Sequence, residues 1–297
     1  MKTQLTITNA RLRKDGGESL HTIAISDGEI AALDPEGTKA LETDQTIDAE
    51  GGLVTEAFVN GHLHLDKVYT LDKLGDQALA NYHGAGMGGA MTAIELAAEV
   101  KKNYDRTWII ENVRRACDLA VRFGTATIRA FADVDTTGKL EGVAALLQAR
   151  EEYRGKLELE VVAFPQDGLL RDPGAEELVE EAVKMGADCV GGIPWIEFTD
   201  VEAQKHIDRM TALASRYDRK VSMLVDDAGD PTLRTLEYLA AATVREGLQG
   251  RVTAQHARAM ALYPEPSFRR LVPQLKRAGI GVVSDPHTGP LHARVED

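Results

Sequence analysis

The sequence has 297 residues, of which 43% are hydrophobic and 27% are charged, and its formal net charge is -13. This composition is typical of a folded globular protein and excludes an extensively disordered chain. The acidic balance and the lack of any run of lysine and arginine argue against a nucleic-acid-binding surface. A small neutral or cationic ligand suits this balance better.

The first residues carry no recognisable targeting signal. MKTQLTITNARL alternates like a strand and lacks the apolar core of a signal peptide, and no apolar run approaches the roughly 20 residues of a membrane span. We therefore predict a cytoplasmic protein without a membrane segment. Cys117 and Cys189 lie in apolar surroundings, which predicts buried thiols and no disulfide.

Residues 1–57 have the pattern of a small sheet. The runs LTITNARL, HTIAISDGEIAAL and QTIDAEGGLV are separated by glycine-containing turn signals. From residue 58 onward, short apolar runs alternate with amphipathic helical stretches, which is typical of βα units around a parallel sheet. We therefore predict a β-rich segment over residues 1–57 and a larger (β/α) domain over residues 58–297.

The apolar runs of the larger domain recur at even steps. Runs that end near residues 164, 193, 224, 255 and 284 are 29 to 31 residues apart, which suits the repeated strand and helix of a TIM-type (β/α)8 barrel. Further strands are expected at 58–62 and 125–131, and helices at 175–185, 201–217 and 232–246. This makes seven barrel strands. For the eighth, either the sequence is a fragment of a longer protein, or something else closes the sheet.

The stretch 69–103 contains HGAGMGGAM, which formally matches the dinucleotide motif G-x-G-x-x-G at Gly84, Gly86 and Gly89. No predicted strand leads into this motif, so we expect no nucleotide site there. A mobile loop over the barrel mouth is the better interpretation. Active sites of such barrels lie at the C-terminal ends of the strands, where this stretch begins.

The stretch FVNGHLHLDK contains two histidines one residue apart. Residues two apart in a strand point to the same face, so His62 and His64 can present two imidazole nitrogens to one metal ion. Alternating histidines on a half-buried strand can also be satisfied by backbone carbonyls. Because metal sites use three or more protein ligands, the pair alone leaves both interpretations open.

Polar residues follow other predicted strands as well. Gln166 and Asp167 come after the third strand, Asp226 and Asp227 after the fifth, and His256 after the sixth. All five therefore belong to one face of the barrel if the strand count holds. A carboxylate there could serve as a ligand or a proton shuttle, and an amide could pair with a polar ligand edge.

Five motifs in this order resemble the amidohydrolase superfamily, and within it the cytosine deaminase-like branch: FVNGHLHLDK (58–67), VVAFPQDG (161–168), EEAVKMGADCVGGIPWIEF (180–198), VDDAGD (225–230) and RVTAQHARAM (251–260). The resemblance implies a (β/α)8 barrel and a flanking β-sandwich built partly from the N-terminal segment. It also implies one divalent metal ion, zinc or iron, in the barrel mouth, and a protein that commonly forms homo-oligomers.

The resemblance implies a role for each matching residue. His62 and His64 match metal ligands, and Gln166 matches the glutamine that contacts the amide edge of the substrate. His256 matches a histidine that activates or orients the nucleophile and the leaving group, and Asp227 stands where a glutamate usually shuttles protons. The implied enzyme is an amidohydrolase or deaminase that hydrolyses C–N bonds of a cyclic amidine, pyrimidine or triazine-like compound through metal-activated water.

The sequence departs from this pattern at several positions. Leu224 stands where a histidine ligand is expected, and Phe131 and Trp195 replace histidines, which predicts a more apolar substrate pocket. Asp226 could turn inward and replace the lost ligand, although adjacent strand residues face opposite ways. The alternative is a relative with weak or no metal affinity that binds a heterocyclic ligand without hydrolysing it.

Two expectations concern the end of the sequence. The aspartate ligand of the eighth strand has no counterpart in it. His287 and His292 follow the seventh predicted strand, in a region that helps to line the pocket in the resembling enzymes. A loop role and a site role stay open for both.

Overall fold

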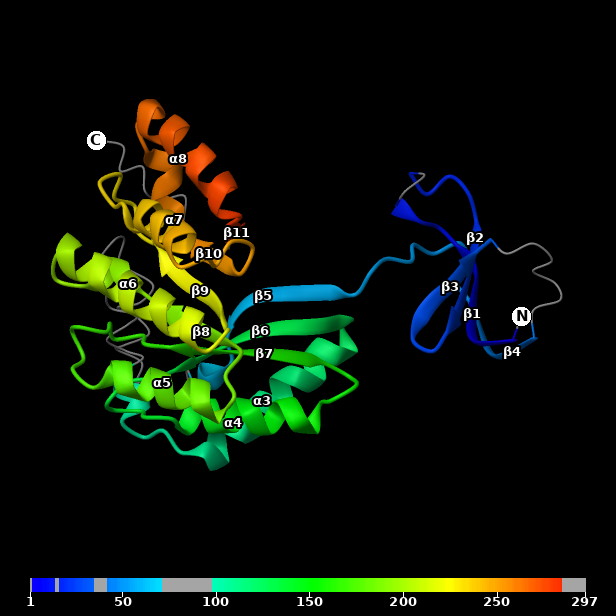
Figure 1. Ribbon diagram of the computed structural model, residues 1–297. Coiled ribbons are helices and arrows are strands. Elements are labelled where there is room, and N and C mark those ends of the chain that lie inside the picture. Colours follow the sequence, from blue (N-terminus) through cyan, green and yellow to red (C-terminus); the bar gives the residue numbers. More distant parts are fainter. Residues whose placement is uncertain (1, 14–15, 35–41, 71–97, 285–297) are drawn as a thin grey trace, which may run out of the picture. The chain divides into compact units, whose positions relative to one another are not determined.

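The computed structural model describes residues 2–13, 16–34, 42–70 and 98–284 (Figure 1). The chain divides into two compact units, Met1–Ala57 and Phe58–Asp297. Within the described ranges, no helix is both long enough and apolar enough to cross a membrane.

The first unit is a four-stranded mixed sheet in the order β3-β2-β1-β4. Its strands are β1 (Lys2–Ala10), β2 (His21–Ser26), β3 (Glu29–Leu33) and β4 (Glu42–Asp48). β1 pairs antiparallel with β2 and parallel with β4, and β2 pairs antiparallel with β3. The buried apolar side chains among its described residues are Ala10, Ile23 and Ala24, so this sheet holds a small core.

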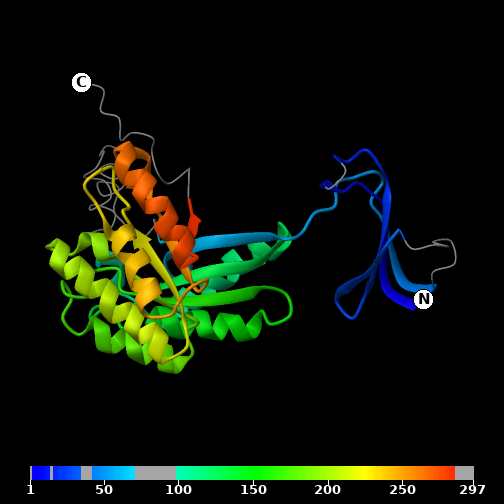
Figure 2. The same ribbon diagram turned by 45° about the horizontal axis from the view of Figure 1, so that its top comes forward.

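The second unit is a seven-stranded parallel sheet whose order follows the chain from β5 to β11. Its strands are β5 (Phe58–His64), β6 (Thr125–Asp133), β7 (Glu158–Phe164), β8 (Cys189–Gly192), β9 (Lys220–Val225), β10 (Val252–His256) and β11 (Gly281–Val283). Its helices are α3 (Arg106–Arg122), α4 (Glu141–Glu152), α5 (Ala175–Met185), α6 (Asp200–Arg216), α7 (Thr235–Arg245) and α8 (Glu265–Ala278). These helices flank the sheet (Figures 1 and 2), and the seven strands confirm the predicted TIM-type barrel class.

The sheet curls until its two edge strands approach each other. A Cβ atom on Gly61 of β5 would lie 3.5 Å from the methyl groups of Val283 in β11, and Gln255 of β10 donates to the Gly61 carbonyl at 3.4 Å. β5 and β11 form no ladder in the described part of the chain. The seven strands thus make a nearly closed barrel.

Side chains of the strands alternate between two hydrophobic clusters. In β6, Ile128 and Ala130 belong to the cluster between sheet and helices, whereas Phe131 belongs to the cluster inside the barrel. This alternation follows from the two-residue period of a strand. Cys117 lies in the outer cluster and Cys189 in the inner one, and both are buried free thiols, as the sequence predicted.

The predicted helices are present with small shifts of their bounds. The helix predicted at 175–185 has these bounds in the structure, and α6 begins and ends one residue earlier than predicted. α7 begins three residues later than predicted, because Asp230 Oδ1 accepts hydrogen bonds from the amide and hydroxyl of Thr232 at 2.8 and 2.6 Å. These bonds hold the chain in a turn before the helix.

Candidate active site

The predicted site residues gather at the C-terminal ends of the barrel strands. His62 and His64 are among the last three residues of β5, and His256 is the last residue of β10. Gln166 follows the end of β7 by two residues, and Asp227 follows the end of β9 by two. Parallel strands all end at the same face of the barrel, so the structure brings these five residues to one mouth.

The three histidines are half-buried and neutral. The ring centroid of His62 lies 5.1 Å from that of His64 and 4.6 Å from that of His256. Burial, reinforced by the ammonium of Lys67, lowers the pKa of His62 to about 4 and the pKa of His64 well below its usual value. Burial and the neighbouring His62 lower the pKa of His256 to about 3. All three rings therefore carry no charge at pH 7.

Aromatic side chains pack in the barrel interior next to the histidines. Phe131 is fully buried, and its ring centroid lies 4.3 Å from that of His62 and 5.4 Å from that of His64. Trp195, in the short helix η5 (Pro194–Ile196), packs against the same inner cluster. Its indole N–H is buried without a hydrogen-bond partner among the described residues. A ligand with an acceptor group would satisfy this donor.

Asp227 is buried beside two basic residues. Its Oδ1 lies 2.8 Å from Nε of Arg258, and its Oδ2 lies 3.8 Å from Nε2 of His256. The side chain is 11% exposed, so the guanidinium offsets a carboxylate charge that has little contact with water. The position suits a group that accepts a proton and later returns it.

Asp226 faces away from the mouth and binds the start of α7. Its Oδ1 accepts from the amide and hydroxyl of Thr235 at 2.7 and 2.6 Å, and its Oδ2 accepts from the amide of Leu236 at 3.2 Å and from the hydroxyl of Tyr263. The first turn of a helix has free N–H groups, and this carboxylate satisfies two of them. Asp226 therefore does not replace the lost histidine ligand, and that alternative from the sequence is wrong.

Leu224 supplies no ligand either. The residue is 5% exposed, and its side chain packs in the inner cluster with Phe131 and Val162. The position at which the resemblance expects a histidine is therefore part of the apolar interior of the barrel.

The side chain of Lys67 links residues at the ends of three strands, a contact that the sequence analysis does not predict. It lies in the short helix η3 (Leu65–Lys67), directly after β5. Its Nζ donates to Oδ1 of Asp133, the last residue of β6, at 2.7 Å and to Oε1 of Gln166 at 2.9 Å. A signal was present, because Lys67 closes the motif that contains both histidines and Asp133 directly follows an apolar strand pattern.

Lys101 is a second lysine at this face that the sequence reasoning missed. Its side chain is fully buried, and its Nζ lies 3.5 Å from Asp133 Oδ2, 2.9 Å from Asp135 Oδ2 and 2.7 Å from Asp167 Oδ2. Burial alone would lower the pKa of Lys101, but the surrounding carboxylates raise it above its usual value. Lys101 therefore remains an ammonium that neutralises the acidic side of the mouth.

One set of three potential ligands in the described ranges brings its ligand atoms within 4.8 Å of one another: His64, Asp66 and Asp133. Asp66 is fully buried, and burial together with the charge of Asp133 raises its pKa to about 7. The ammonium of Lys67 is already 2.7 Å from Asp133, so repulsion from a fixed positive charge disfavours a metal ion at this set.

His62 and His64 fit a metal ion as two of its ligands. Nδ1 of each is buried without a hydrogen-bond partner in the part of the chain that the structure describes. A neutral imidazole with an available nitrogen is the commonest metal ligand in proteins. Leu224 and Asp226 contribute no donor atom. Among the described residues, a further imidazole beside this pair is that of His256, whose ring centroid lies 4.6 Å from that of His62.

Comparison with known proteins identifies the family of this chain. Residues 45–296 match the Amidohydrolase family. The chain belongs to the amidohydrolase family. This amidohydrolase is 32% identical over 294 residues to N-isopropylammelide isopropyl amidohydrolase of Pseudomonas sp. (strain ADP), a match that covers 97% of this chain and 70% of the relative.

Two further relatives of this amidohydrolase are deaminases by name. Pterin deaminase of Rhizobium rhizogenes is 28% identical, over 89% of this chain and 58% of the relative. The crystal structure of 5-methylcytosine deaminase from Klebsiella pneumoniae, liganded with 5-fluorocytosine, superimposes with a TM-score of 0.85 at 31% identity. That superposition covers 95% of this chain and 66% of the other. The amidohydrolase chain thus spans between 58% and 70% of the length of these three relatives.

Some predicted features of this amidohydrolase lie outside the described residues. They are the glycine-rich motif with Gly84, Gly86 and Gly89, and the two late histidines His287 and His292.

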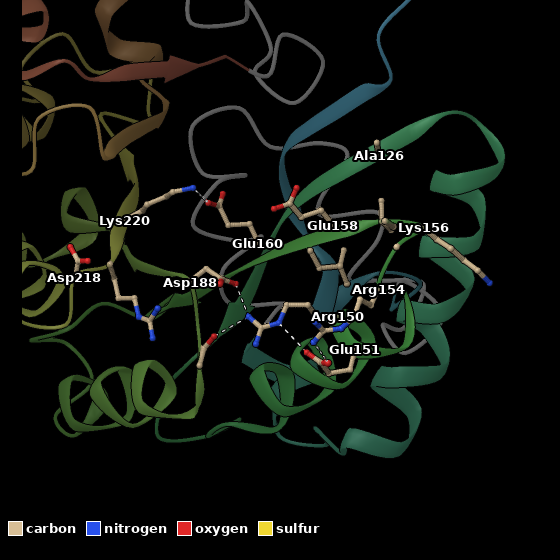
Figure 3. Close-up of a pocket in the computed structure, with 15 residues that line it drawn as sticks. Ala126, Arg150, Glu151, Arg154, Lys156, Glu158, Glu160, Asp188, Asp218 and Lys220 are labelled. Carbon is tan, nitrogen blue, oxygen red and sulfur yellow. Dashed lines mark hydrogen bonds and ion pairs between the residues drawn. The ribbon is translucent and has the colours of Figure 1, made fainter. Parts of the chain in front are cut away.

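The opposite end of the amidohydrolase barrel holds a hollow of about 940 Å³ (Figure 3). Its lining includes Glu160 and Lys220, near the N-terminal ends of β7 and β9, together with Arg150 and Asp188. Lys220 Nζ lies 2.6 Å from Glu160 Oε1, and Arg150 Nη1 lies 2.9 Å from Asp188 Oδ2. These charges pair with one another, and in enzymes of this fold the active site lies at the other end of the barrel.

Proposed function

We propose that this amidohydrolase is a metal-dependent hydrolase of C–N bonds that acts on an amino-substituted pyrimidine, triazine or pterin-like heterocycle. The observation that carries the proposal is the convergence of His62, His64, Gln166, Asp227 and His256 at one barrel mouth. The three relatives support it, because each is named for hydrolysis or deamination of a nitrogen heterocycle.

His62 and His64 would hold one divalent ion, zinc or iron. When bound, such an ion lowers the pKa of a coordinated water toward neutrality and so supplies hydroxide at pH 7. Burial of the two imidazoles lowers their pKa values, and the ammonium of Lys67 lowers them further. Both rings are therefore neutral at pH 7, and their nitrogens stay available to a metal ion.

The remaining residues handle the substrate and the proton. Asp227 takes a proton from the attacking water and returns it to the amine that leaves when the C–N bond breaks. His256, whose Nε2 lies 3.8 Å from Asp227 Oδ2, orients the attacking water and the leaving amine.

Gln166 contacts the polar edge of the heterocycle, and Trp195 provides apolar surface for its planar ring. Phe131, which the sequence suggested for the same role, is fully buried and supports the rings of His62 and His64.

The proposal is tested with protein purified without chelator. Its metal content is measured by elemental analysis, and amine release is measured with cytosine, 5-methylcytosine, N-isopropylammelide and pterin. We expect about one divalent ion per chain, by the ligand-count rule, and release of ammonia or, from N-isopropylammelide, of isopropylamine. A metal-loaded protein that releases no amine from any of these compounds would overturn the proposal.

A second candidate function is binding of a heterocycle without hydrolysis. The buried Leu224 favours it, because one barrel strand contributes an apolar side chain where a metal donor is expected. Calorimetric titration with the same four compounds, in protein that contains no metal, separates the two candidates. Binding without turnover, together with tighter zinc binding by Leu224→His, supports the second.

A further inference from the structure

The side-chain amide of Gln166 is held at one end. Its Oε1 accepts from Lys67 Nζ at 2.9 Å, and the same ammonium donates to Asp133 Oδ1 at 2.7 Å. The side chain of Asp133 is fully buried. Lys67 is therefore anchored by a carboxylate that belongs to the barrel strand β6, and Gln166 is anchored by Lys67.

The chemistry of lysine decides which way this amide faces. The oxygen and nitrogen of a glutamine amide are assigned from the groups around them, and an ammonium can only donate hydrogen bonds. The atom that faces Lys67 is therefore the oxygen, and the NH2 group points away from it. Gln166 is 7% exposed, and its NH2 group has no hydrogen-bond partner among the described residues.

We propose that Lys67 is a specificity-determining residue of this amidohydrolase. By holding the oxygen of Gln166, it leaves the two N–H donors of the amide for the ligand. The site then selects a heterocycle that presents a hydrogen-bond acceptor, an oxo group, at the contacted edge, and disfavours one that presents an amino group there. This inference rests on the proposed function, because it assumes that a heterocycle binds beside Gln166.

The physical basis is a mismatch between donors. An amino group opposite the Gln166 NH2 places two donors face to face, and a buried donor without an acceptor loses the hydrogen bond that it makes to water. An oxo group accepts from the amide instead. Sites that bind a polar substrate group through a buried partner discriminate strongly against analogues that lack the matching group.

The test uses three pairs of compounds that differ by one oxo or amino group. They are cytosine and 2,4-diaminopyrimidine, ammeline and melamine, and pterin and 2,4-diaminopteridine. Dissociation constants are measured by calorimetry, and KM and kcat are measured where turnover occurs. In the wild-type protein we expect the oxo member of at least one pair to bind at least about tenfold more tightly.

Variants of Lys67 then separate its role from a general effect on folding. Lys67→Met removes the donor and should reduce the oxo preference to less than about threefold, whereas Lys67→Arg keeps a donor and should retain it. The ratio within a pair cancels any effect that both members share, such as altered metal binding. Gln166→Glu gives a second route, because it removes the NH2 donors without changing Lys67, and it should abolish the preference too.

Lys220→Met is the matched control. Lys220 also pairs with a carboxylate of this barrel, Glu160 at 2.6 Å, but at the opposite end of the strands (Figure 3). The control should keep the oxo preference.

Each outcome decides a different statement. If none of the six compounds binds, this inference fails, and the proposed function fails too if 5-methylcytosine and N-isopropylammelide also release no amine. If compounds bind or are deaminated, but the wild type prefers neither member or prefers the amino member, only the inference fails. It also fails if folded Lys67→Met and Gln166→Glu proteins both keep the wild-type preference.

Discussion

The two ends of the barrel strands differ in how many of their buried polar atoms lack a hydrogen-bond partner. At the N-terminal end, Lys220 and Arg150 pair with carboxylates (Figure 3). The side chain of Lys220 is 57% exposed, and among the described residues Nε of Arg219 is buried there without a hydrogen-bond partner. At the C-terminal end, Nδ1 of His62 and of His64 and Oδ1 of Asp66 are buried without hydrogen-bond partners among the described residues. An unsatisfied buried polar atom costs about 1 to 3 kcal/mol. A bound ion or ligand would recover this cost, so the larger number of such atoms at the C-terminal end supports the proposed site there.

The largest expected effect comes from removing an unpaired group at the C-terminal end. His62→Ala should lower turnover roughly 1000-fold or more, as loss of a group central to the reaction does. The free energy of unfolding of the metal-free protein should change by only about 1 kcal/mol, because loss of packing is offset by loss of an unsatisfied polar atom. Initial rates and urea unfolding measure the two. If the variant is unfolded under the assay conditions, so that unfolding explains the lost turnover, His62 would be a structural residue and the two ends of the barrel would not differ in function.

The second prediction concerns a polar group at the same end that is fully satisfied. Asp226→Ala leaves the Thr235 and Leu236 amides and the Tyr263 hydroxyl without their acceptor. We expect the free energy of unfolding to fall by about 3 kcal/mol, because several buried donors lose their partner. Urea unfolding followed by circular dichroism measures the change. A loss below about 1 kcal/mol would show that Asp226 is not the anchor of α7.

The third prediction uses pH and the buried pair of Glu197 and His206, whose Oε1 and Nδ1 lie 2.7 Å apart. Burial would raise the pKa of Glu197, but the hydrogen bonds from His206 and from the amides of Leu169 and Leu170 outweigh it and hold this pKa below its ordinary value of 4.5. A depressed carboxyl pKa contributes stability above about pH 4.5 that is lost as the pH falls through the folded-state pKa.

Glu197→Gln should therefore lower the free energy of unfolding at pH 7 by about 2 kcal/mol, since hydrogen bonds to a charged group are lost. The difference between wild type and variant should shrink as the pH falls below 4.5. Urea unfolding at pH 7 and pH 4 tests both statements. A difference that stays constant over this range would mean that the charge of Glu197 contributes nothing.

The smallest effect is expected at the N-terminal end. Lys220→Met breaks a pair in which the lysine side chain is 57% exposed and the glutamate side chain 15% exposed. Partly exposed ion pairs contribute about 0.2 to 1 kcal/mol, and salt weakens them. We therefore expect a change of about 0.5 kcal/mol or less in 0.5 M salt, with turnover unchanged. A large loss of turnover would show that the N-terminal end also takes part in function.

Much of the fold could be predicted because its signals are local. Buried parallel strands appear as short apolar runs, and their steps of 29 to 31 residues reflect one strand, one helix and two loops. The helix at 175–185 begins with acidic residues and ends before Gly186, so both of its ends could be predicted from the sequence. The start of α7 could not be predicted, because the side chain of Asp230 accepts hydrogen bonds from Thr232 and holds it in a turn before the helix.

The candidate site was predictable where residues two apart share a strand face, as His62 and His64 do, and where polar residues follow apolar runs, as Gln166, Asp227 and His256 do. Lys101 was missed because its partners Asp133, Asp135 and Asp167 belong to other strand ends, and no local pattern links them. Their pairing arises only when parallel strands bring distant segments to one face.

The sequence by itself determined the barrel class, the position of its strands and the residue types available for chemistry at their ends. The tertiary structure decided which of these residues face the mouth. Asp226 and Asp227 are neighbours of identical chemistry, yet the free N–H groups of α7 attract the first and leave the second beside His256 and Arg258. It likewise decided that Lys67 holds the oxygen of Gln166, because hydrogen bonds depend on distances between atoms that the order of residues does not contain.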